Sequence, residues 1–141
     1  MKKVLKICLI IVAVALCFGL AACDRGPFEG FNDDNAILKT TSRSLSGSKI
    51  TNISSKYELK ADKFNGVIRI KDITVAKDPT LNMDLKINSG KFKVVLVKDD
   101  KVYLVTDKDV TTGSIEIELA AGTYNLRIVG QDANIDFTFT Y

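Results

Sequence analysis

Strict alternation of apolar and polar side chains in the second half of this 141-residue chain is the feature that most limits its fold. The pattern occupies residues 81–88, 115–119, 124–128 and 135–141, where apolar residues stand at every second position. Successive side chains of a β-strand point to opposite faces of a sheet, so this period is typical of half-buried strands. Beyond the first 23 residues, no stretch has the apolar repeat of an amphipathic helix. The sequence therefore predicts an all-β domain.

Residues that favour turns separate the alternating stretches at the spacing expected of antiparallel structure. Asn65-Gly66 gives the strongest signal, because a type I′ turn needs positive φ at both central residues. Further corners are predicted at 88–90, 98–101 and 130–132. We predict strands near residues 54–62, 66–75, 81–89, 91–98, 102–106, 114–120, 123–130 and 133–141. Seven or eight short strands favour a two-sheet antiparallel sandwich, with a small closed barrel as the alternative.

One short motif favours a particular kind of sandwich. Residues 119–126 (LAAGTYNL) resemble the tyrosine corner of immunoglobulin-like domains, in which a Tyr at the start of a strand returns its hydroxyl to the preceding crossover. The resemblance implies that Tyr124 is a structural anchor. Antibody domains carry a Cys two residues later, and Leu126 stands there in this chain, so the antibody-type disulfide is absent. The alternative is an ordinary hairpin that contains Gly122 and enters a strand with an inward Tyr.

The first 23 residues differ in character from the rest of the chain. A positive start, Met1-Lys2-Lys3, leads into an uninterrupted apolar stretch from Ile7 to Cys23, which is near the lower length limit for a membrane span. The stretch ends in Leu20-Ala21-Ala22-Cys23, directly before polar sequence. This boundary resembles the lipobox of bacterial lipoproteins.

The lipobox resemblance implies that the thiol of Cys23 receives a diacylglyceryl group and that a signal peptidase then cuts between Ala22 and Cys23. Residues 1–22 would be removed as a signal peptide. Two acyl chains on Cys23 would then hold the mature chain at the extracytoplasmic face of the cell membrane, because two chains anchor stably where one binds only marginally. The alternative is an uncleaved N-terminal membrane helix. The other two cysteines lie in the signal peptide, so the mature chain has no pair of thiols for a disulfide.

Residues 23–45 are predicted to be the lipidated Cys and a flexible tether, and residues 46–141 the sandwich domain. The tether lacks periodicity and is rich in Gly, Asn, Asp, Ser and Thr, and about 20 such residues would span roughly 25 Å. Four apolar residues allow the alternative in which part of this stretch docks on the domain; these are Phe28, Phe31, Ile37 and Leu38.

The charge of the mature chain excludes several classes of partner. Three of the 20 basic residues lie in the signal peptide, which contains no acid, so 17 basic residues face 17 acidic ones. A neutral chain has no electrostatic footprint for nucleic acid, so no nucleic-acid partner is predicted. The chain contains no His, which excludes His-based triads and His-containing zinc sites.

Little else in the sequence indicates catalysis or metal binding. No Gly-x-Ser-x-Gly elbow occurs, and the Ser-Lys neighbours at 48–49 and 55–56 lie in polar segments that are better explained as solvated surface. The acidic clusters at 33–35, 99–100 and 107–109 lack the spacing of a calcium loop and are predicted to be turns. We therefore predict no enzymatic activity, no cofactor and no metal.

The predicted hairpin at residues 92–105 is apolar on both faces, which a strand with one face in water should not be. One interpretation is a docking patch for a partner protein or ligand, formed by Val95, Val97, Tyr103 and Val105. The other is that residues of the same chain cover this face. The covered interpretation is favoured because the segment 36–53 supplies apolar residues.

Taken as a whole, the chain resembles small surface lipoproteins of bacteria, with a lipobox, a short polar tether and one β domain. We predict a membrane-anchored, non-catalytic binding or assembly module at the cell surface. The alternatives are a small surface enzyme or enzyme inhibitor, and a purely structural envelope protein. Analogy of fold cannot supply the ligand.

Overall fold

The computed structural model describes residues 26–111 and 113–141. The predicted signal peptide, its cleavage site and Cys23 lie outside these residues. Among the residues described, no helix has the length and hydropathy needed to cross a membrane. Two short helical turns precede seven strands: η1 (Glu29–Asn32), α2 (Asp34–Lys39), β1 (Arg43–Ser46), β2 (Lys49–Ile53), β3 (Lys56–Val75), β4 (Thr80–Lys98), β5 (Lys101–Thr106), β6 (Ser114–Glu116) and β7 (Gly122–Thr140).

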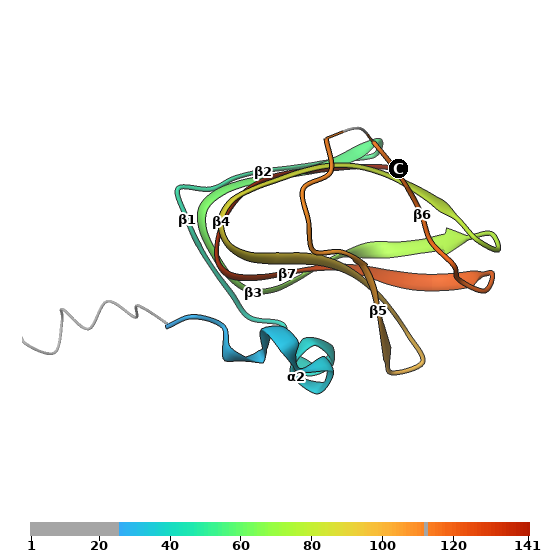
Figure 1. Cartoon of the computed structure of the whole chain (residues 1–141), viewed down its shortest axis with the longest axis horizontal. Helices are drawn as coiled ribbons and strands as arrows, with labels where there is room; N and C mark the ends of the chain where they lie inside the picture. The colour runs from blue at the N-terminus through green and yellow to red at the C-terminus, as the bar shows by residue number, and fades with distance from the viewer. Residues whose placement is uncertain (1–25, 112) are drawn as a thin grey trace, which may run out of the picture.

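The strands form one antiparallel sheet that folds over on itself. The strand order is β1-β3-β7-β4-β5, with β2 added to β3 and β6 added to β4. The long strands β3, β7 and β4 all bend near their middle, so their two halves belong to two facing layers (Figure 1). One end of the resulting sandwich is closed by the bends. At the other end, called the open end below, the β3–β4 loop and the chain between β6 and β7 pass from one layer to the other (Figure 1). The predicted all-β antiparallel sandwich is confirmed.

The bends fall at three of the corners that the sequence predicts as turns between separate strands. Residues 65–66, 88–90 and 130–132 lie inside β3, β4 and β7, which continue through them. The registers of all three strands shift here, as expected for β-bulges, which bend a strand and increase its twist. Three long strands therefore replace six of the predicted short ones. The remaining corner is a turn as predicted, because Asp99 and Asp100 both have positive φ between β4 and β5.

Side chains and backbone lock the bends against one another. Asn65 is 5% exposed; its Oδ1 accepts a hydrogen bond from the Asp132 backbone N–H at 2.7 Å, and its Nδ2 donates to Asp132 Oδ1 at 2.9 Å. Gly90 has φ of 75°, and a Cβ there would overlap the backbone carbonyl of Asp132. Gly130 leaves room for the ring of Phe64. The closed end therefore depends on close approach of backbone and side chains from different strands.

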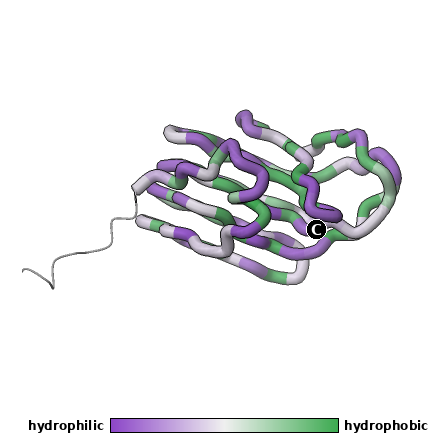
Figure 2. Tube along the Cα trace, turned by 90° about the horizontal axis from the view of Figure 1, so that it is seen from below, coloured by the Kyte–Doolittle hydropathy of each residue, from purple (hydrophilic) through white to green (hydrophobic). Residues whose placement is uncertain are grey.

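The main core lies between the two layers, and its alternating pattern is visible along the strands as hydrophilic and hydrophobic residues in turn (Figure 2). Four aromatic rings cross it in contact, with centroid distances of 6.4, 5.7 and 6.1 Å: Tyr57, Phe137, Phe92 and Phe64. Burial of such large apolar side chains supplies most of the driving force for folding, at about 1.5–3 kcal/mol each. The alternation in the sequence thus positions this core.

A second apolar cluster lies on the outer face of the layer that contains β5. It consists of Val67, Val95, Val97 and Val129 from the sheet, with Phe31 and Ile37 from the N-terminal segment. Ile37 is fully buried, and Arg127 Nη1 donates hydrogen bonds to the carbonyls of Ile37 at 2.8 Å and Leu38 at 3.0 Å. Residues 28–39 therefore belong to the folded domain and not to the flexible tether predicted for 23–45. For residues 28–39 the alternative is correct, in which part of the predicted tether docks on the domain. The apolar side chains of these residues cover a face of the sheet that would otherwise be exposed.

Candidate functional site

A cleft opens at the end of the sandwich opposite the bends. It has a volume of about 510 Å³. Its walls come from the last residues of β3, the first residues of β4 with Pro79 before them, and the last residues of β7 with Tyr141 after them. Because β3 and β7 end here and β4 begins here, three distant parts of the chain meet at one opening.

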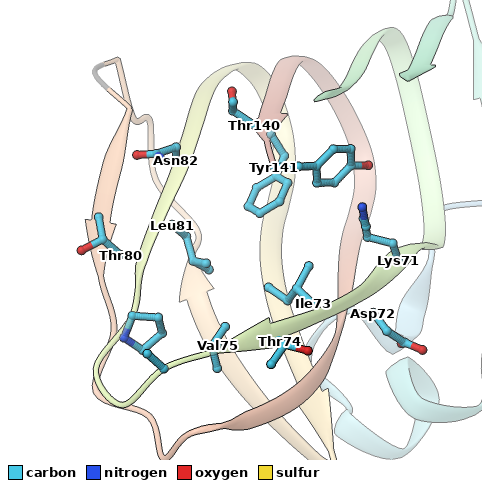
Figure 3. A pocket seen from close by; sticks show the side chains of 13 residues that line it. Lys71, Asp72, Ile73, Thr74, Val75, Thr80, Leu81, Asn82, Thr140 and Tyr141 are labelled. Carbon is cyan, nitrogen blue, oxygen red and sulfur yellow. The ribbon is translucent and has the colours of Figure 1, made fainter. Parts of the chain in front are cut away.

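Apolar side chains form the floor of the cleft. Leu81 from β4 and Ile73 from β3 point toward one another across it, and Val75 lies beside them (Figure 3). Leu81 and Val75 are each 6% exposed, and Phe139 is 3% exposed, so these side chains also belong to the edge of the main core. The floor is therefore the outer edge of the main core, where Ile73 is half-buried and the other side chains are buried.

One aromatic ring, Tyr141, remains accessible at the rim. It is 37% exposed, and its ring meets that of Phe139 edge-on at a centroid distance of 5.5 Å. The Lys71 ammonium lies 3.7 Å from the Tyr141 ring centroid, as a cation–π pair (Figure 3). The partial burial of Tyr141 raises the pKa of its phenol above the usual value, because the charged form is less well solvated there. Tyr141 therefore stays neutral at physiological pH.

Four of the lining residues carry neutral polar groups: Thr74, Thr80, Asn82 and Thr140. The side chains of Thr80 and Asn82 point away from Leu81 and the floor (Figure 3), and Asn82 Oδ1 already accepts a hydrogen bond from Ser114 Oγ at 2.8 Å. The single carboxylate of the lining, Asp72, accepts a hydrogen bond from Asn125 Nδ2 at 2.7 Å, and its Oδ1 lies 3.6 Å from Arg69 Nη2. The cleft can therefore offer apolar contact, one aromatic face and a few polar groups at its rim.

The structure separates the four residues of the predicted docking patch. Val95 and Val97 are 1% and 9% exposed and lie under the N-terminal segment. Tyr103 pairs with Leu96 on β4, so Tyr103 and Val105 pack against the main core on the opposite face. Unbroken pairing from the turn at 99–100 sets Tyr103 opposite Leu96 and Leu104 opposite Val95, so Tyr103 shares a face with Leu96 and not with Val95. The covered interpretation therefore holds for Val95 and Val97, and the four residues do not form an exposed patch.

Acidic residues that could suggest a metal site have local structural roles instead. Asp33 accepts a hydrogen bond from the Asn35 backbone N–H at 2.9 Å as the N-cap of α2, and Asp109 accepts one from the Ile87 N–H at 2.6 Å. Within the part of the chain that the structure describes, no three acidic or cysteine side chains gather as a metal site.

The sequence analysis did not identify the cleft. Its lining comes from the ends of three strands that lie up to 70 residues apart in the chain, and no local pattern marks them. The available signal was Tyr141, an aromatic residue that follows the last strand and continues its alternation beyond the sheet.

Comparison with known proteins adds little to this site. No family model and no curated protein matches the chain. Two solved structures of mutant family 29 carbohydrate-binding modules are similar, at 12% and 14% sequence identity and TM-scores of 0.37 and 0.39. Each covers 70% of this chain, and this chain covers 76% and 75% of them. At these TM-scores the likeness says nothing about the ligand of this chain.

Proposed function

We propose that this protein is a non-catalytic binding module, anchored by lipid on Cys23 at the extracytoplasmic face of a cell membrane, that holds a neutral ligand in the open-end cleft. The lining of the cleft is the observation that supports the binding role. An apolar floor with a few convergent polar groups is typical of ligand sites. Asp72, the one carboxylate of the lining, is already engaged by Asn125 and Arg69, so the cleft offers no pair of groups for acid–base chemistry.

The chemistry of the lining favours a neutral oligosaccharide. The faces of a sugar ring are apolar and suit the floor and the ring of Tyr141, while the hydroxyl groups at its edges can find polar partners at the rim in Lys71 and the Tyr141 hydroxyl. Besides Asp72, the described lining contains one charged side chain, Lys71, and its ammonium lies over the Tyr141 ring. The cleft therefore offers a charged ligand little electrostatic complementarity.

Binding of neutral oligosaccharides on an array, followed by calorimetry with the strongest ligand, tests this role. We expect Tyr141→Ala to weaken binding by about tenfold, which corresponds to about 1.4 kcal/mol, because the variant loses the accessible ring. Leu104→Ala is the matched control, since Leu104 is 54% exposed and lies outside the cleft. Equal losses in the two variants would contradict the cleft as the site. Binding of uncharged peptides in place of oligosaccharides would contradict the ligand class.

The anchoring half of the proposal rests on the Leu-Ala-Ala-Cys boundary and has its own test. We expect metabolic labelling with a fatty acid to mark the full chain and to fail with Cys23→Ala, because no other residue at the boundary can form the thioether. Cys17→Ala is the control: it removes a cysteine from the predicted signal peptide and should leave labelling intact. Label retained on the Cys23→Ala chain would contradict the proposal.

A further inference from the structure

The N-terminal segment docks at the closed end of the sandwich. The Phe28 backbone N–H donates a hydrogen bond to Asn65 Oδ1 at 3.1 Å, and the Phe28 carbonyl accepts one from Gln131 Nε2 at 3.0 Å. Asn65 and Gln131 both lie in the bends of the long strands. The folded part of the chain therefore begins at the closed end (Figure 1).

The segment that follows is held along its length. Phe31 is 8% exposed and Ile37 is fully buried in the second apolar cluster, and Arg127 bonds to the carbonyls at the end of α2. The Lys93 ammonium also lies 4.8 Å from the centroid of the Phe31 ring. Residues 28–39 consequently cannot lengthen the connection between the domain and an anchor while the domain is folded.

Chain length then limits how far the closed end can lie from an anchor at Cys23. Cys23 precedes Phe28 by five residues, which span at most about 18 Å when fully extended. The cleft lies at the far end of the sandwich. Along β3 the cleft lining begins at Lys71, five steps from Gly66 at the bend, and reaches Val75, nine steps from it, so the cleft lies about 17–30 Å from the bend.

We propose that the closed end of the sandwich faces the membrane and that the cleft faces away from it, toward solvent. This inference rests on the proposed lipid attachment at Cys23. The short connection replaces a tether of about 20 residues, which would have left the orientation of the domain free. The cleft would thus be presented to ligands outside the bilayer, at a distance set by the length of the long strands.

The charges at the closed end indicate that the anchor, not the lipid headgroups, sets this orientation. Lys63 and Lys91 are exposed there, and so is Asp62, while Asp132 lies 3.5 Å from Lys63. Both signs are present, so attraction to an anionic surface is weak and should be screened by salt. The orientation should therefore persist at high ionic strength.

Energy transfer from the domain to lipid headgroups tests the orientation. The mature chain has no cysteine besides Cys23, so a single cysteine can be introduced and labelled with a donor dye. Lys91→Cys places the dye at the closed end and Lys77→Cys places it at the open end, and both lysines are exposed. The lipidated full chain is reconstituted in vesicles whose headgroups carry an acceptor. We expect clearly stronger transfer from position 91 than from position 77.

A linker control separates anchor length from other causes. Insertion of 20 Gly and Ser residues between Arg25 and Gly26 should reduce the difference between positions 91 and 77, because the added chain spans roughly 25 Å. Equal or stronger transfer from position 77 in vesicle-bound protein would overturn the orientation and leave lipid anchoring intact. If the chain carries no fatty acid and does not float with vesicles, the proposed anchoring itself fails.

Discussion

Tyr124 is the residue whose role the sequence predicted most closely. Its hydroxyl donates a hydrogen bond to the Ala120 carbonyl at 2.9 Å, its side chain is buried, and its ring meets that of Tyr103 edge-on at 5.7 Å. The predicted tyrosine corner is therefore present. Prediction succeeded here because donor and acceptor lie four residues apart, within one local motif.

Tyr124→Phe should lower the free energy of unfolding by about 0.5–1.5 kcal/mol, because it deletes this hydrogen bond and keeps the ring. Urea titration measures the change. Tyr103→Phe is the matched control, since no partner for the Tyr103 hydroxyl is found among the described residues, and it should shift the midpoint less. An unchanged midpoint for Tyr124→Phe would mean that the hydrogen bond contributes nothing to stability.

Asn65 is a single residue whose role the sequence predicted wrongly. Its sequence neighbourhood predicts a hairpin turn, yet it is a buried connector whose partners, Asp132 and Phe28, lie 67 and 37 residues away. An Asn-Gly pair provides positive φ and a compact amide in a turn and in a bulge alike. Local sequence cannot distinguish the two uses, because the difference lies in what packs against the amide.

At the scale of the elements, the same ambiguity merged six of the eight predicted short strands into three long ones, β3, β4 and β7. The sequence analysis also missed two short strands, β1 and β2, which lie before the first predicted strand. The alternation on each side of a bulge was predicted correctly, since the apolar side chains within 81–88 and 135–139 do face the main core. The connections between these stretches were predicted wrongly, as turns in place of bulges. Bulges in β3, β4 and β7 lie side by side and bend the sheet together, and that alignment depends on pairing across the sheet.

Gly90→Ala tests whether close approach at the bulge matters more than positive φ alone. Gly90 and Gly113 have φ of 75° and 57°, but a Cβ at Gly90 would overlap the Asp132 carbonyl, whereas a Cβ at Gly113 meets nothing within 4 Å. We expect Gly113→Ala to cost about 1 kcal/mol from backbone strain and Gly90→Ala to cost several kcal/mol. Thermal or urea unfolding of both variants measures this. Equal costs would show that the bend tolerates a side chain.

For the whole molecule, the sequence analysis predicted that the second face of residues 92–97 is covered and named the segment 36–53 as the source of the cover. The cover is residues 28–39, all of which were assigned to the tether, so only the start of the named segment takes part. Six residues of α2 are too few to show a helical repeat, and a helix this short gains its stability from packing rather than from propensity. The cleft escaped prediction for a similar reason, because only the folded sheet brings the ends of β3, β4 and β7 together.

The folding unit should therefore begin near residue 26 and not at residue 46. A soluble chain of residues 26–141 keeps the helical cover, whereas one of residues 41–141 keeps β1 but exposes Val95, Val97 and their neighbours. Loss of Phe31 and Ile37 removes two buried side chains worth about 1.5–3 kcal/mol each, a large share of a domain's usual 5–15 kcal/mol. We expect the shorter chain to unfold at a clearly lower urea concentration and to aggregate more readily.

Single substitutions on α2 separate this packing from chain length. Within the 26–141 chain, Ile37→Asp places a carboxylate in the second apolar cluster, where Ile37 is fully buried, and should lower stability by several kcal/mol. Asn35→Asp adds the same charge at an exposed position of the first helical turn and should change stability little, because a helix N-terminus favours negative charge. If both variants and the 41–141 chain have the same melting temperature as the unaltered 26–141 chain, the helical cover adds no stability. The connection from Cys23 to the sheet would then be free to lengthen, and the fixed orientation of the cleft would lose its mechanical basis.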